Sequence, residues 1–230
     1  MATSRRPAHP ADPEGAVPAS AVERVYRHTR TAILMGDYPP GFSLRTSELA
    51  RLNGVSTIPV REAMRRLEAE RLVESVANKG VRVARLSASD LADAYQLRTI
   101  LEVEAVRVAA GRLTSLDRER AIKLRDEMAR RFAGGDEADA YAAHRALHFI
   151  VYERTNSPWL VHTISTLWDH TERYRRLGMQ WLQQPESQAA QHDEVIEALF
   201  GGDPEAAVAA LRAHFETSRS LLNQRAESEE

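Results

Sequence analysis

The sequence contains no cysteine, which excludes disulfide bonds and any metal site built on thiolates. It also lacks an apolar run long enough to span a membrane, and its first residues lack the apolar core of a secretory signal. Nothing therefore suggests export, and we expect a cytoplasmic protein with no membrane partner. Hydrophobic residues make up 43% of the 230 residues, which is normal for a globular chain with room for one large or two ordinary domains.

Charged residues are distributed unevenly along the chain. Residues 20–86 hold 12 Lys/Arg against 7 Asp/Glu, a net of +5, whereas residues 87–230 hold 17 against 24, a net of −7. Residues 1–19 include four prolines and many small residues, and we expect a disordered tail there and another over 224–230. A basic domain over 20–86 joined to an acidic one over 87–223 is typical of a nucleic-acid-binding module with a separate ligand or partner module.

The pattern that decides the first domain lies between residues 47 and 86. A helical apolar pattern over 47–52 stops at Asn53-Gly54, a common signal for a helix end, and Ser56 is a suitable N-cap for a second helix. Two short β-branched runs, 72–73 and 81–83, then flank a turn. Two short helices and a hairpin wing form a winged DNA reader. The residues expected on the apolar face of the second helix are Val60, Met64 and Leu67.

The alternative for this region is an ordinary small α/β domain, in which helix, turn, helix and hairpin also occur. Arginines favour the DNA-binding interpretation, because Arg61 and Arg65 cluster near the start of the second helix, where a helix meets a groove. An amphipathic helix is expected before this motif, over Ala21 to Met35, ended by Gly36.

After residue 86 the sequence has no strand signal and reads almost entirely as helix. The predicted fold is therefore mainly α: an N-terminal winged helix-turn-helix with a small β-hairpin wing, followed by an all-α bundle of about six helices. Pro158 and Pro204 stand where first-turn prolines are favourable. The helices are expected over about 91–113, 115–133, 136–155, 157–181, 187–200 and 204–223.

Four histidines of the helical region have a spacing that suggests a metal site. His144 and His148 are four residues apart and so lie on one helix face, while His192 and His214 fall in the last two helices. A single histidine in a bundle is more often a hydrogen-bonded core residue than a ligand. Four on inward-facing helices instead indicate a metal, because imidazole is costly to bury unpaired and bundle interiors are common metal sites.

Four segments of the first domain occur in a characteristic order: Ile33–Leu44, Glu48-Leu49-Ala50, Gly54-Val55-Ser56 and Pro59-Val60-Arg61-Glu62-Ala63. Through these segments the domain resembles the GntR family of bacterial transcription regulators. The resemblance implies a homodimer that binds a short pseudo-palindromic operator in double-stranded DNA, with Arg61 touching DNA and the wing tip at Lys79-Gly80 entering the minor groove. Other expected DNA contacts are Arg45, Ser56, Thr57 and Arg65.

The sequence departs from that family's usual pattern at two positions. The family commonly reads Val-Ser-Arg-Thr-Pro-Val-Arg, whereas Thr57 and Ile58 stand here in place of the arginine and the threonine. Arginine makes bidentate contacts with guanine, while threonine offers one hydrogen bond or a contact with a thymine methyl group. We expect an altered operator preference rather than a loss of DNA binding.

The second domain contains an ordered set of residues: Leu97-Arg98, Glu102, Leu147-His148, Asn156–Leu160, His192, Ile196, Gly202-Asp203 and His214. Through these residues it resembles the FCD ligand-binding domain, which defines the FadR subfamily of GntR regulators. Many FCD domains hold a divalent metal with one aspartate and three histidines, and the resemblance maps the histidines onto His148, His192 and His214. His144 stands at the aspartate position, where an imidazole favours Zn²⁺ or Ni²⁺ over Mn²⁺ or Mg²⁺. Alternatively, His144 is not a ligand and the metal site is weak or empty.

The resemblance also implies a small carboxylate metabolite as effector. Arg98 is the expected anchor, because a guanidinium binds a carboxylate through two parallel hydrogen bonds, with Tyr95 beside it. The alternative for Arg98 is an i,i+4 salt bridge to Glu102. The basic run Arg173–Arg176 is expected to be a solvated helix face.

Three functions are compatible with these patterns: a transcription regulator, a metalloenzyme, and an architectural DNA-binding dimer whose metal only stabilises the helical bundle. A metalloenzyme is disfavoured because no His-Glu-x-x-His motif occurs and no carboxylate lies between His144 and His148. The resemblance implies a repressor released by a metabolite.

Overall fold

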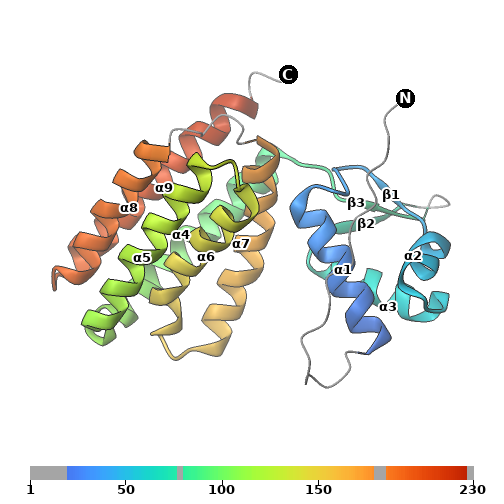
Figure 1. Cartoon of the computed structure of the whole chain (residues 1–230), viewed down its shortest axis with the longest axis horizontal. Coiled ribbons are helices and arrows are strands. Elements are labelled where there is room, and N and C mark those ends of the chain that lie inside the picture. Colours follow the sequence, from blue (N-terminus) through green and yellow to red (C-terminus); the bar gives the residue numbers. More distant parts are fainter. Residues whose placement is uncertain (1–19, 77–79, 179–184, 227–230) are drawn as a thin grey trace. The chain divides into compact units, whose positions relative to one another are not determined.

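The computed structural model describes residues 20–76, 80–178 and 185–226. The chain divides into two compact units, Met1–Arg85 and Leu86–Glu230, which Figure 1 shows as a small mixed unit and a helical one. The tail expected over residues 1–19 and the wing-tip residue Lys79 lie outside the described residues.

The first unit begins with the amphipathic helix that the sequence predicts, α1 (Ala21–Met35). The Ser20 hydroxyl accepts a hydrogen bond from the backbone N–H of Glu23 at 3.1 Å and so caps its first turn. Gly36 ends the helix with φ 85°, a left-handed conformation that glycine adopts without steric cost.

Two further helices, α2 (Thr46–Asn53) and α3 (Thr57–Ala69), pack with α1 around one apolar core. The expected apolar face of α3 is confirmed, since all three of its predicted residues are at least 96% buried. This core holds α3 by one face and leaves its other face exposed. Its fully buried members include Val25, Val60, Leu67 and Val83.

The wing is a three-stranded antiparallel sheet rather than the two-stranded hairpin expected. Strands β2 (Val73–Val76) and β3 (Gly80–Val83) form that hairpin, and β1 (Ser43–Leu44) adds to the other edge of β3. Two residues are too short for a strand periodicity to show in sequence. Backbone hydrogen bonds of 2.9 Å hold β1 in place, from Gly41 N–H to Val83 O and from Val83 N–H to Phe42 O.

In the second unit, the described residues form six α-helices and no strand, as expected (Figure 1). Three of these helices begin at proline, whose missing N–H would have no helical partner there in any case. A short 3₁₀ turn, Ala110–Arg112, follows the first helix of the unit, which ends at Ala109. The helices are α4 (Ala88–Ala109), α5 (Ser115–Ala133), α6 (Glu137–Glu153), α7 (Pro158–Gly178), α8 (Pro185–Phe200) and α9 (Pro204–Ala226).

Helix α9 continues to Ala226, so the first three residues of the tail expected over 224–230 are helical. Helix α4 packs against α6, α7 and α9, and the apolar core between these helices includes Val106, Ile164 and Leu211. Among the described residues, no helix is long and apolar enough to cross a bilayer.

Candidate functional site

The exposed face of α3 is the candidate DNA-binding surface of the first unit. Helix α2 ends at Gly54, whose φ of 63° turns the chain, and α3 starts three residues later. Ser56 precedes α3 but makes no side-chain capping hydrogen bond, so only its position agrees with the expected N-cap.

Three side chains on α3 share one exposed face: Ile58, Arg61 and Arg65. Ile58 is 77% exposed, so this face presents one large apolar side chain beside the two arginines. The Arg65 guanidinium lies 3.5 Å from the Glu62 carboxylate, and its side chain is also 77% exposed. An exposed pair of this kind contributes little to stability and leaves the arginine able to turn toward a phosphate or a base.

Arg66 has a different, structural role. It donates to the Glu23 carboxylate at 2.9 Å, and its guanidinium carbon lies 4.1 Å from the centre of the Tyr26 ring. Arg66 therefore ties α3 to α1, which the sequence alone did not distinguish from the neighbouring arginines.

The other predicted DNA contacts come from several segments of the first unit. Arg45 is exposed immediately before α2, and Thr57 is exposed at the first residue of α3. Gly80 is exposed at the start of β3 with φ 83°, while Lys79 beside it is outside the described residues.

The four predicted histidines come together in the core of the second unit. His144 and His148 come from α6, His192 from α8 and His214 from α9, and one ring nitrogen of each lies within 4.8 Å of the others. All four side chains are buried, with exposed fractions of 1–7%. Burial lowers the pKa values of His144, His148 and His214 well below the usual range, which keeps these imidazoles neutral, as metal ligands must be.

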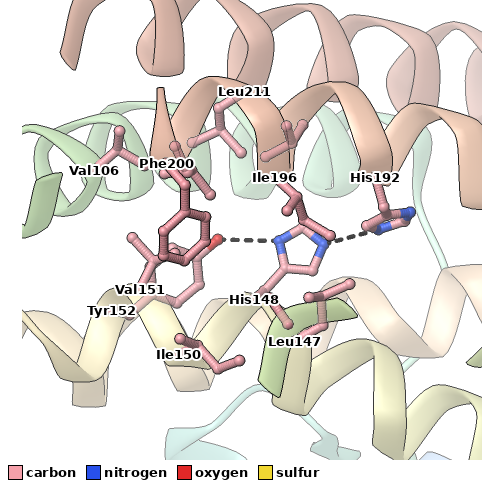
Figure 2. A pocket seen from close by; sticks show the side chains of 13 residues that line it. Val106, Leu147, His148, Ile150, Val151, Tyr152, His192, Ile196, Phe200 and Leu211 are labelled. Carbon is pink, nitrogen blue, oxygen red and sulfur yellow. Dashed lines mark hydrogen bonds between the residues drawn. The ribbon is translucent and has the colours of Figure 1, made fainter. Parts of the chain in front are cut away.

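The hydrogen bonds around His148 suit a metal ligand. Tyr152 donates its single hydroxyl proton to Glu102, so its oxygen can only accept from His148 Nδ1, at 3.3 Å. The other ring nitrogen, Nε2, then carries the lone pair and accepts a hydrogen bond from Nε2 of His192 at 3.2 Å (Figure 2). Two nitrogens bound to one tetrahedral zinc lie about 3.4 Å apart, so this spacing fits a shared ion.

An apolar pocket adjoins this pair of histidines. It is lined by residues of α4, α5, α6, α8 and α9, and Figure 2 shows the rings of His148 and His192 among them. Its apolar lining includes Ile196, Phe200 and Leu211. A small ligand could therefore approach the histidines through mainly hydrocarbon surroundings.

Arg98 and Tyr95, the predicted effector contacts, are each only 2% exposed. Arg98 donates to the Glu102 carboxylate at 2.6 Å and to the Thr171 hydroxyl at 2.8 Å, so the salt bridge weighed as its alternative is present. Its guanidinium also lies 4.3 Å from the centre of the Trp168 ring. Tyr95 packs edge-on against Phe215 in the core.

The basic run on α7 is not the solvated helix face expected. Arg173 is 1% exposed and Arg175 is 7% exposed, although residues two apart point to different sides of a helix, so α7 is covered on more than one side here. Arg175 donates to Nδ1 of His144 at 3.2 Å. Sequence patterns missed Arg175, Tyr152 and Thr171 as neighbours of the site, because a charged run and single polar residues give no periodic signal of inward orientation.

Comparisons with known proteins agree with this two-part organisation. Residues 21–83 match the family described as "Bacterial regulatory proteins, gntR family", and residues 93–217 match the FCD domain. A Streptomyces ambofaciens protein named as an uncharacterized HTH-type transcriptional regulator in an unstable DNA locus is 30% identical over 191 residues, covering 83% of this chain and 80% of its own.

Two further comparisons extend over most of the chain. The Escherichia coli protein named HTH-type transcriptional repressor GlaR is 27% identical over 211 residues, covering 86% of this chain and 94% of its own. The solved structure of E. coli McbR/YncC has a TM-score of 0.79 at 23% identity and covers 90% of this chain and 99% of its own, which establishes a shared fold.

Proposed function

The chain belongs to the GntR family of bacterial transcription regulators and carries an FCD domain, and on this premise we propose that it is a metabolite-responsive repressor. It binds a short pseudo-palindromic operator as a homodimer through its first unit. A small carboxylate, bound at a divalent metal in the second unit, releases it. The observation that carries the proposal is an exposed arginine face on α3 in one unit and four converging buried histidines in the other.

The DNA-binding part of the proposal rests on α3. Its apolar face is held in the core, while Ile58, Arg61 and Arg65 project from the opposite face. A recognition helix needs this arrangement, because the side chains that enter the major groove must be supported from behind. The positive charge of the arginines adds affinity for phosphates, and this contribution weakens with salt.

The sensing part rests on the histidines. His148, His192 and His214 are buried and close enough to bind one ion, and Zn²⁺ or Ni²⁺ suits three imidazoles. Such an ion supplies a Lewis-acidic position for a carboxylate oxygen. Arg98 would orient the rest of a carboxylate, but only by sharing its guanidinium with Glu102.

Repression is inferred from the relatives, of which GlaR is named as a repressor. A carboxylate can release the operator only if it binds the DNA-free arrangement of the dimer more tightly than the DNA-bound one. By linkage, operator DNA must then weaken carboxylate binding by the same factor.

Fluorescence anisotropy tests this function on DNA from upstream of the protein's own gene, with a scrambled duplex as competitor and at two salt concentrations. We expect specific binding with a steep salt dependence. Arg61→Ala should weaken it at least tenfold, whereas Arg118→Ala, which removes a half-exposed arginine of α5 in the second unit, should leave it unchanged. The same comparison is then extended to a library of genomic fragments. The proposal would be overturned if the wild-type protein bound every fragment no more tightly than the scrambled duplex.

The same assay tests sensing. Zinc-loaded wild-type protein should release the operator on addition of the right small carboxylate, and a His148→Ala/His192→Ala protein should bind the operator but ignore the acid. If the acid released the double variant from the operator as well as it released the wild-type protein, the effector would act at a site that does not involve these histidines.

A further inference from the structure

We propose that His144 is not a metal ligand but a hydrogen-bond donor for an anion bound at the metal, and that Arg175 holds it in that role. The metal centre then consists of His148, His192 and His214 and keeps an open coordination position. The inference rests on the metal site of the proposed function and assigns its fourth histidine a different task.

The argument begins with the contact between Arg175 and His144. A guanidinium has only N–H donors and no acceptor, so His144 Nδ1, 3.2 Å away, must accept. The accepting nitrogen carries a lone pair, and the single ring proton of the neutral imidazole therefore sits on Nε2. Neither nitrogen can then bind a metal, because Nδ1 is occupied by the arginine and Nε2 bears hydrogen.

His148, one helical turn away on α6, has the opposite arrangement. The contact from its Nδ1 is to a hydroxyl oxygen that has already given its proton to Glu102, so Nδ1 is the donor and Nε2 carries the lone pair. Metal-binding histidines are generally oriented in this way, by an acceptor on the outer nitrogen. Arg175 is a pure donor in the same place beside His144, and it selects the other tautomer.

His144 Nε2 is buried and has no hydrogen-bond partner among the residues that the structure describes. A buried N–H without an acceptor is unfavourable, because it has lost its hydrogen bonds to water and gained none in the protein. An anion at the metal would remove this cost, because its oxygen could accept from Nε2–H while a second oxygen binds the ion. His214 Nδ1 also lacks a hydrogen-bond partner in the described part of the chain, which agrees with a role as a metal ligand.

The charges of the site favour the same ligand. Three neutral imidazoles leave both positive charges of a divalent ion uncompensated. The nearest buried carboxylates are already engaged, Glu102 with Arg98 and Tyr152, and Glu172 with Arg176 at 3.5 Å and Arg175 at 3.9 Å. An incoming small carboxylate would therefore supply the missing negative charge as well as the acceptor.

Cobalt(II) and acetate test the assignment without DNA. Co²⁺ reports its ligand number and geometry through its visible absorption, and acetate is the simplest carboxylate probe. We expect His144→Ala to change Co²⁺ affinity less than threefold and to weaken acetate binding about tenfold, the loss of one charge-assisted hydrogen bond. His144→Gln, which keeps an N–H near the same position, should retain acetate binding within threefold.

His148→Ala is the matched control on the same helix, and it should lose Co²⁺ affinity at least 100-fold. Arg175→Met should let His144 turn its lone pair toward the ion, which adds a nitrogen ligand, alters the absorption spectrum and weakens acetate binding. If His144→Ala loses Co²⁺ as completely as His148→Ala, His144 is a ligand and the inference is wrong. It is also wrong if acetate binds equally well to the wild-type and His144→Ala proteins.

These outcomes are separable from the proposed function. Failure to bind operator would disprove the DNA-binding proposal while leaving the Co²⁺ results unaffected. Wild-type protein that binds no Co²⁺ would disprove the metal centre and, with it, the role given to His144, whatever the DNA assay shows.

Discussion

At the residue scale, two histidines one turn apart on α6 differ through the side chains that contact their outer nitrogens. His148 faces the Tyr152 hydroxyl, which Glu102 orients, and His144 faces the Arg175 guanidinium. Both contacts come from side chains outside the histidine cluster. These neighbours therefore determine whether each imidazole has a lone pair available for a metal.

Removing the Tyr152 hydroxyl should therefore weaken metal binding. Tyr152→Phe leaves His148 free to adopt either tautomer, and we expect a 10–100-fold loss of Zn²⁺ affinity, measured by competition with a chelator. Tyr141→Phe is the matched control, because Tyr141 is also buried on α6 but its ring packs against Phe132 and the Arg176 guanidinium. Equal affinities in the wild-type and Tyr152→Phe proteins would contradict this role.

Thr57 should determine part of the operator preference. Thr57→Arg places a bidentate donor at the exposed start of α3, and we expect it to gain preference for guanine at one operator position by about 1–3 kcal/mol. The measurement is selection of bound sequences from a random duplex library. Ser115→Arg adds the same charge to an exposed position of the second unit, and a similar shift in that variant would attribute the effect to charge alone.

At the element scale, the start of α5 is joined to the end of α6 by Asp117. The Thr114 hydroxyl and Asp117 form a capping box, and Arg154 grips both oxygens of the Asp117 carboxylate, at 2.7 and 3.0 Å. The Arg154 and Thr114 hydrogen bonds lower the pKa of Asp117 from 3.8 to about 2, against the opposing effect of burial.

The sign of this shift predicts a contribution to stability in acid. A carboxyl group whose pKa is lower in the folded state stabilises the fold above its unfolded pKa, and that contribution is lost as the pH falls from about 4 to about 2. We expect Asp117→Asn to cost on the order of 2 kcal/mol at pH 7 and less at pH 2–3, measured by urea unfolding across pH. Glu119→Gln, an exposed carboxylate two residues away, is the control. A cost for Asp117→Asn that does not change with pH would refute the explanation.

At the scale of the whole molecule, metal binding should stabilise one unit and not the other, because all four histidines belong to the second unit. At a free Zn²⁺ concentration of 100 times Kd the gain is about 2.7 kcal/mol. For a unit of this size we expect Tm to rise by roughly 5–15 °C. Calorimetry should therefore show one transition that moves with zinc and one that does not.

The shift should vanish in the His148→Ala/His192→Ala protein. His162→Ala, which changes an exposed histidine of α7, should keep it. A zinc-dependent shift in both transitions would mean that the two units unfold together or that zinc binds elsewhere.

The sequence by itself determined the two-part organisation, the limits of most helices and the membership of the histidine cluster. These features depend on local signals: Gly36 and Gly54 end helices by left-handed turns, prolines begin α7 and α9, and a four-residue spacing puts His144 and His148 on one face. The sequence did not predict strand β1, because two residues are too few to show the alternating pattern of a strand. Its partner strand also lies almost forty residues further along the chain.

Only the tertiary structure decided what each polar residue of the site does. Arg175 belongs to a run that looked solvated, and it became a buried partner of His144 because α7 turns that side toward α6. The sequence left two roles open for Arg98, an anchor for a carboxylate effector and an ion pair with Glu102. In the structure Arg98 contacts Trp168 and Thr171 and forms the ion pair. Arg175 reaches His144 from α7, and Glu102 of α4 fixes the proton of the Tyr152 hydroxyl beside His148, so both imidazole proton positions depend on contacts between helices.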